Sequence, residues 1–139
     1  MDTATPEMRA LARRLIALEV ARDHAPAAAG ACRVCDKLRG PLARLAGIAS
    51  FRALLSRALA LAKAEVAALN PVQVRQDGSL AGLDAAGPGA GGDGGTAVVT
   101  HMLGLLVLFI SDALTRQLVR DVWPDATAAE TDGRAGGQP

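Results

Sequence analysis

Residues 51–69 read FRALLSRALALAKAEVAAL, and residues 96–122 read TAVVTHMLGLLVLFISDALTRQLVRDV. Both stretches are rich in Leu and Ala, which lead the helix-propensity ranking, and their apolar residues recur at helical spacing. They predict two long helices that are apolar over wide arcs, with the first placed centrally in the fold. Because such helices must pack against neighbours on more than one side, they favour a mainly α-helical bundle.

Shorter elements precede these two helices. Residues 5–24 predict a first helix with Thr5 as its N-cap. A second, short helix should end at Gly40-Pro41, because the residue before a proline avoids the α region. Pro41 can then begin a brief third helix that Gly47 ends. Ser50 is the expected N-cap of the helix over residues 51–69.

The whole chain, at 139 residues, has the length of one domain. Residues 72–80 predict a β-hairpin about Asp77-Gly78, inserted between the two long helices. The Gly-rich residues 84–95 are expected to form a flexible loop, and residues 124–139 a disordered tail. The fold class we expect is therefore all-α in the main, a compact bundle of about four to five helices with a small hairpin insert, over residues 1–123.

The composition limits the possible functions. The chain contains 15 Lys and Arg against 14 Asp and Glu, a net charge of +1. A net charge this close to zero does not attract the chain to nucleic acid or to an anionic membrane. The longest apolar stretch, residues 97–110, is too short to span a bilayer, and the acidic amino terminus lacks the basic region of a secretory signal. A cytoplasmic bacterial protein is the expectation.

Two segments carry a resemblance. The stretches CRVCDKLRGPLARLAGIASFRALLSRALALAKAEV, from Cys32, and THMLGLLVLFISDALTRQLVRDVWPD, from Thr100, resemble a group of small bacterial helical proteins of unassigned function. The resemblance implies a compact bacterial domain with a hairpin insert. It implies no activity, no cofactor and no catalytic residue.

Few residues suggest catalytic or metal chemistry. Cys32 and Cys35 form a C-x-x-C pair, but no strand precedes them as in redox motifs, and a zinc site would need two further ligands. Core packing at positions i and i+3 is the favoured interpretation. His101 could be a buried base or a pH switch, yet no nucleophile can be assigned to it. We therefore expect no catalytic residue, no cofactor and no metal, and a protein that is not an enzyme.

DNA binding is one alternative function. Residues 42–57 faintly resemble a helix-turn-helix. Three basic side chains there could contact phosphates, namely Arg44, Arg52 and Arg57. The second helix of that motif would, however, present Phe51 and Leu55 to a wet groove, and burial in protein is the more favourable use of them. Another alternative is a carrier of a small apolar ligand, held between the two most apolar helices.

The favoured hypothesis is a non-enzymatic protein–protein interaction module. Its surplus of apolar helical surface would bind another chain, either as a homo-oligomer or as an adaptor. Gly104 and Ser111 lie two helical turns apart and predict a notch where another helix can approach closely. The predicted contact surface comprises Phe51, Leu55, Gly104, Leu105, Leu108, Phe109 and Ser111.

Overall fold

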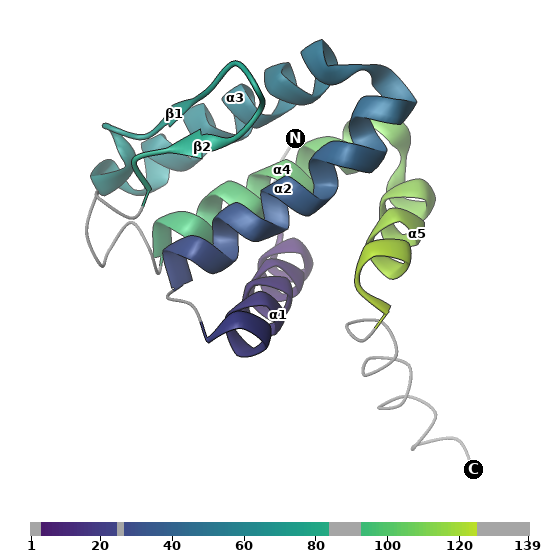
Figure 1. Cartoon of the computed structure of the whole chain (residues 1–139), viewed down its shortest axis with the longest axis horizontal. Helices are drawn as coiled ribbons and strands as arrows, with labels where there is room; N and C mark the ends of the chain where they lie inside the picture. Colours follow the sequence, from purple (N-terminus) through teal and green to yellow (C-terminus); the bar gives the residue numbers. More distant parts are fainter. Residues whose placement is uncertain (1–3, 25–26, 84–92, 125–139) are drawn as a thin grey trace.

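The computed structural model describes residues 4–24, 27–83 and 93–124. In chain order its elements are α1 (Pro6–Asp23), α2 (Ala27–Ala46), α3 (Ile48–Glu65), the 3-10 helix η1 (Ala67–Leu69), β1 (Gln73–Val74), β2 (Leu80–Ala81), α4 (Gly95–Ile110) and α5 (Asp112–Val122). The expected mainly helical bundle, with a hairpin between the third and fourth helices, is confirmed (Figure 1). Most of the expected Gly-rich loop and all but the first residue of the expected tail lie outside the described residues.

Helix α1 begins and ends where the sequence predicts. The Thr5 side chain accepts a hydrogen bond from the Met8 backbone N–H at 3.2 Å, and Pro6 occupies the first helical position. His24 ends the helix in the left-handed conformation, with φ of 52°. Residues adjacent in sequence determine both ends of α1, so the sequence alone was sufficient to predict where this helix begins and ends.

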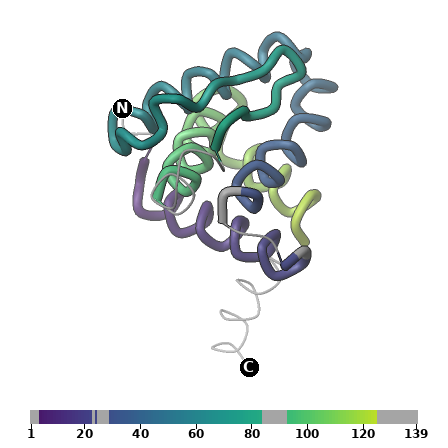
Figure 2. Tube along the Cα trace, turned by 60° about the vertical axis from the view of Figure 1, so that its left-hand side comes forward, coloured from purple at the N-terminus to yellow at the C-terminus, as the bar shows by residue number. Residues whose placement is uncertain are grey.

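Helix α4 lies at the centre of the bundle and packs against α1, α2 and α3 (Figures 1 and 2). Every residue from Ala97 to Leu106 is buried. The expectation that residues 51–69 form the central helix is therefore corrected. Helix α3 buries one face and ends at Glu65, and η1 follows as a separate turn. The lack of Lys, Arg, Asp and Glu in α4 is what allows it to be surrounded.

Helix α2 runs without interruption through Pro41, so the predicted division at Gly40-Pro41 is wrong. An interior proline removes one backbone hydrogen bond and crowds the preceding turn, at a cost of about 3 kcal/mol. The side chains of Leu38 and Leu42, on either side of the proline, are buried. Burial of each contributes roughly 1.5–3 kcal/mol, which offsets the cost and keeps the helix continuous.

The segment predicted as one helix over residues 96–122 is two helices, because the chain turns at Ser111. This residue has φ of 98° and ψ of 159°, a conformation that is costly for a residue with a side chain. Its hydroxyl accepts a hydrogen bond from the Leu114 N–H at 3.3 Å, and its carbonyl accepts one from the Thr115 hydroxyl at 2.7 Å. Ser111 is therefore the N-cap of α5.

The hairpin forms about Asp77-Gly78, as predicted, with antiparallel pairs Gln73–Ala81 and Val74–Leu80. Gly78 has φ of 86°, and a Cβ there would lie 3.1 Å from the ring of Phe51. The hairpin thus packs against α3.

Helix α3 begins after Gly47, which has φ of 91°, rather than after the predicted N-cap Ser50. Glycine adopts this positive φ at little cost and permits an abrupt turn between α2 and α3.

We expect the substitution Ser111→Gly to stabilise the fold by about 1 kcal/mol. Glycine relieves the positive-φ strain and is nearly as good an N-cap as serine. Ser111→Ala is the matched control, because it keeps the strain and removes the capping oxygen, and it should destabilise by about 1 kcal/mol. Urea denaturation of the three proteins measures both effects. A loss of stability in Ser111→Gly would show that this backbone conformation carries no strain.

Candidate functional site

Four residues of the predicted contact surface are buried, namely Gly104 and the core residues Phe51, Leu55 and Leu105. Phe51 and Leu55 are completely buried, and Leu105 is nearly so. Phe51 and Leu55 lie one turn apart on the face of α3 that meets the rest of the bundle, and the hairpin turn at Gly78 covers the Phe51 ring. A partner cannot reach these side chains, so the surface predicted through them is corrected.

The predicted notch between Gly104 and Ser111 does not exist as a single helical feature, because Ser111 turns the chain away from α4. Gly104 does line a cleft of about 240 Å³. The cleft lies where the start of α1 meets the end of α4 and the start of α5, and its other lining residues are Thr5, Glu7, Met8, Val107, Leu108, Asp112 and Arg116.

The exposed apolar side chains gather at two turns of the chain. Among the described residues, the large apolar side chains that stay exposed are Leu45, Ile48, Leu108, Phe109 and Leu114, each between 42% and 57% exposed. The first two flank the α2–α3 turn and the other three flank the α4–α5 turn. Both turns lie at the same end of the bundle (Figures 1 and 2). We call these five residues the corner surface.

Sequence reasoning found Leu108 and Phe109 but missed the other three members of the corner surface. Leu45 and Ile48 fall within residues 42–57, where the sequence indicates burial for Phe51 and Leu55 and indicates neither burial nor exposure for these two. Leu114 was placed inside one long helix. The single sequence signal that could have singled out Leu45 and Ile48 is Gly47 between them, since a glycine between two helical stretches marks a turn.

The two turns differ in charge. Around the α2–α3 turn, residues 37–64 contain no Asp or Glu. Within the described part of the chain, Arg44 and Arg52 have no hydrogen-bond or ion-pair partner, and Arg52 Nε is buried without one. At the α4–α5 turn, the Arg116 guanidinium is shared by two carboxylates, Asp112 at 2.9 Å and Glu7 at 3.0 Å. The α2–α3 turn is therefore basic, whereas at the α4–α5 turn the two carboxylates lie near two guanidinium groups, those of Arg116 and Arg14.

A buried polar cluster holds the end of α5 against the bundle. The Glu19 side chain is buried, and its Oε2 accepts hydrogen bonds from Lys37 Nζ at 2.6 Å and Trp123 Nε1 at 2.8 Å. Burial by itself raises the pKa of Glu19, but the hydrogen bonds from Lys37 and Trp123 and the charge of Lys37 lower it below 4.5 overall. No local sequence pattern indicates this cluster, because its members lie up to 104 residues apart.

His101 belongs to a second polar cluster. Its ring is buried, and its Nε2 donates a hydrogen bond to Glu65 Oε2. Arg9 donates to the other oxygen of Glu65 at 2.9 Å, so the cluster joins α1, α3 and α4. Burial raises the pKa of Glu65, yet the hydrogen bonds from His101 and Arg9 outweigh it and leave the pKa below its ordinary value. His101 is thus a buried histidine whose ring is held by a hydrogen bond to a carboxylate.

The two cysteines lie on α2 without forming a disulfide. Cys35 is buried and Cys32 is half-buried. Burial, with the neighbouring Cys32 and Asp36, raises the pKa of the Cys35 thiol far above its ordinary value, which suppresses the reactive thiolate. In the described ranges no three His, Cys, Asp or Glu side chains come together in a way that could hold a metal ion.

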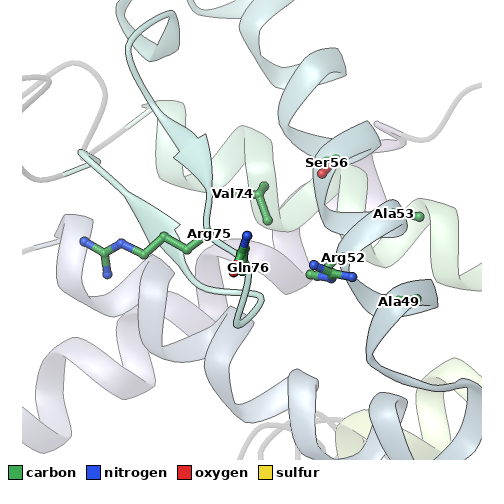
Figure 3. A pocket seen from close by; sticks show the side chains of 7 residues that line it. All are labelled: Ala49, Arg52, Ala53, Ser56, Val74, Arg75 and Gln76. Carbon is green, nitrogen blue, oxygen red and sulfur yellow. The ribbon is translucent and has the colours of Figure 1, made fainter.

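The depression shown in Figure 3 lies between α3 and the hairpin and has a volume of about 290 Å³. Its lining comprises Ala49, Arg52, Ala53, Ser56, Val74, Arg75 and Gln76. The Arg75 side chain points away from Arg52, so the two guanidinium groups do not converge on one anion. The lining offers no carboxylate, imidazole or thiol, so no general base among these residues can activate the Ser56 hydroxyl.

The segment compared with a helix-turn-helix has an unusual geometry for that motif. Only Gly47 separates α2 from α3, whereas the motif uses a turn of about three or four residues. On the exposed side of α3, Ala49 and Ala53 provide no hydrogen-bonding group for a base edge, and Ser56 and Arg57 are the exposed polar side chains beyond them.

No protein-family model matches the chain, and neither does any curated protein or any solved structure. No helix of the described ranges is both long enough and apolar enough to cross a membrane.

The Glu19 cluster predicts an acid-sensitive stability. A carboxylate whose folded-state pKa is lowered contributes stability above its unfolded pKa, and that contribution is lost as the pH falls below 4.5 toward the folded-state value. We expect Glu19→Gln to lower the urea midpoint at pH 7 and to lose less stability on acidification than the wild type. The exposed Glu7→Gln is the matched control. Equal acid sensitivity in wild type and Glu19→Gln would contradict this role for Glu19.

Proposed function

We propose that this protein is a cytoplasmic, non-enzymatic protein–protein interaction module that binds another protein chain through the corner surface. The observation that carries the proposal is the gathering of all five exposed large apolar side chains of the described residues at one end of the bundle. Scattered single apolar residues on a surface are ordinary, whereas a cluster of this kind marks a contact site.

The exposed area is sufficient for a contact site. Five side chains that are about half exposed present on the order of 400 Å² of apolar surface, within the range of functional patches on small proteins. Removing that area from water is worth about 10 kcal/mol before the costs of association. Those costs are of similar size, so a complementary surface on the partner is required.

The corner surface is also held in place before a partner binds. Arg116 joins the start of α5 to Glu7 of α1, and Trp123 joins the end of α5 to Glu19 of α1. A surface that is already ordered loses less conformational entropy on binding. The adjoining cleft beside Gly104 gives a partner side chain a place to enter.

We expect Leu108→Asp and Phe109→Asp to weaken association at least about 30-fold while leaving helicity unchanged, because both side chains are exposed in the free chain. Leu105→Asp should instead unfold the domain, since it places a charge in the core. Ala60→Asp, at an exposed position of α3 away from the corner surface, is the matched control. Circular dichroism reports folding, and sedimentation velocity reports association.

Both self-association and capture of a partner from extracts of the source cells are measured for each variant. Complexes that survive both Leu108→Asp and Phe109→Asp would contradict the proposal. A salt-dependent shift of DNA by the wild type would favour the DNA-binding alternative. Added mass of a lipid in a native mass spectrum would favour the apolar-ligand carrier.

A further inference from the structure

Two turns of the bundle are one residue long and adopt the same backbone conformation with different residues. Gly47, between α2 and α3, has φ of 91° and ψ of 153°, and Ser111, between α4 and α5, has φ of 98° and ψ of 159°. Essentially only glycine occupies this φ/ψ region without strain, because a Cβ crowds the backbone there. The chain therefore has an unstrained residue at the first turn and a strained one at the second.

The sequence on both sides of Ser111 favours a helix. Residues 105–122 contain no Gly and no Pro. A serine inside a helix costs less than a serine in the conformation of this turn. Locally, the chain thus favours one straight helix over residues 95–122, whereas in the structure α5 leaves the line of α4 at a sharp angle (Figure 1). Tertiary contacts of α5 must hold the bent form in place.

The turn can straighten without opening the core around it. From Val107 to Leu114 no side chain is buried, so this segment has few tertiary contacts to lose. The ion pair between Asp112 and Arg116 is spaced i and i+4, and a straight helix keeps it. A continued α4 would pass into solvent, because the other helices leave its last turn uncovered. Straightening would carry α5 away from its own bundle.

The surface that α5 covers is specific for this helix. Thr115 and Val119 are the buried residues of α5, which packs on α4 and α2. Trp123 follows them, with its ring buried and its indole N–H donating to Glu19 Oε2 at 2.8 Å. Without α5, the bundle would expose apolar side chains and leave Glu19 without one of its hydrogen bonds. An identical α5 from another copy restores every one of these contacts.

We propose that two copies of this chain exchange α5. Ser111 straightens in each copy, α4 and α5 become one helix, and the α5 of each copy packs on the bundle of the other. Trp123 of one copy then donates its hydrogen bond to Glu19 of the second copy. The exchange relieves two strained residues per dimer, and short strained hinges are the connections that promote it. This inference depends on the α4–α5 turn and not on the corner surface, so it goes beyond the proposed function.

Two substitutions at the hinge should move the monomer–dimer equilibrium in opposite directions. Ser111→Ala keeps the strain of the turn, removes its capping oxygen and favours a helix, so it should strengthen dimerisation at least about tenfold. Ser111→Gly relieves the strain of the turn and disfavours a straight helix, so it should weaken dimerisation at least about tenfold. Size-exclusion chromatography of samples equilibrated at several concentrations measures the dimer fraction of each protein.

Ser56 provides the matched control. It is an exposed serine in the interior of α3, away from both turns. Ser56→Ala and Ser56→Gly change helix propensity by the same amounts as the two hinge variants. Both should show the dimer fraction of the wild type, because neither alters the hinge.

Contacts between chains identify the exchange directly. A dimer is assembled from one isotope-labelled and one unlabelled copy of Ser111→Ala, and isotope-filtered NMR records the contacts between them. Trp123 is the single tryptophan of the chain. Its labelled indole N–H should show cross-peaks to Glu19 of the unlabelled copy. If Ser111→Ala does not fold, the same measurement is made on the wild type at about 1 mM, where the exchanged dimer is expected.

Three outcomes would overturn the inference. They are wild-type and Ser111→Ala proteins that both stay monomeric at about 1 mM, a dimer in which Trp123 contacts only its own chain, and equal dimerisation of Ser111→Ala and Ser111→Gly. The proposed function is tested separately with Ser111→Gly, the variant least able to exchange. Capture of a different protein by Ser111→Gly, and its loss when Leu108→Asp is added, would support the corner surface whether or not α5 is exchanged.

Discussion

Helix α4 carries no Lys, Arg, Asp or Glu, and its residues from Ala97 to Leu106 are all buried. A helix that is apolar on every side must be covered on every side, since exposed apolar surface is costly in water. Helices α1, α2 and α3 meet this constraint by packing around α4. The cover ends before the helix does, so Leu108 and Phe109 emerge at the surface while the sequence is still apolar. The corner surface is thus a direct continuation of the core.

The buried polar clusters determine how the helices are arranged around α4. Glu19 accepts hydrogen bonds from Lys37 and Trp123, and so joins α1, α2 and the end of α5. Any other arrangement of these three helices would separate Glu19 from one of its partners. It would then leave a buried charge without compensation, which costs free energy. Glu65, whose side chain is 35% exposed, joins α1, α3 and α4 through Arg9 and the buried His101, and water weakens this cluster relative to that of Glu19. Apolar packing supplies most of the stability, and these two clusters favour one arrangement over others of similar burial.

The proposed interaction depends on features from three levels of the structure. The turns at Gly47 and Ser111 bring apolar residues of four helices to one end of the bundle. Residues 37–64, which include the α2–α3 turn, carry six Lys and Arg and no Asp or Glu. The hydrogen bonds of Arg116 and Trp123 hold α5 in position before binding. Neither turn alone presents enough apolar area for a stable contact, which is why their proximity matters more than any single residue.

The sequence by itself determined the elements whose signals are local. Thr5 and Pro6 began α1, Asp77-Gly78 turned the hairpin, and the Leu- and Ala-rich stretches gave a helical bundle. It also identified Leu108 and Phe109 among the residues of the candidate site. The tertiary structure alone decided that α2 continues through Pro41, that the chain turns at Ser111, and which faces of the apolar helices are core. The local conformational preference of the chain distinguishes a continuous helix from a broken one by about 1–3 kcal/mol. Burying two or three apolar side chains contributes as much free energy or more, and can therefore reverse that preference. Because that burial depends on residues far apart in the chain, no pattern along the sequence could reveal it.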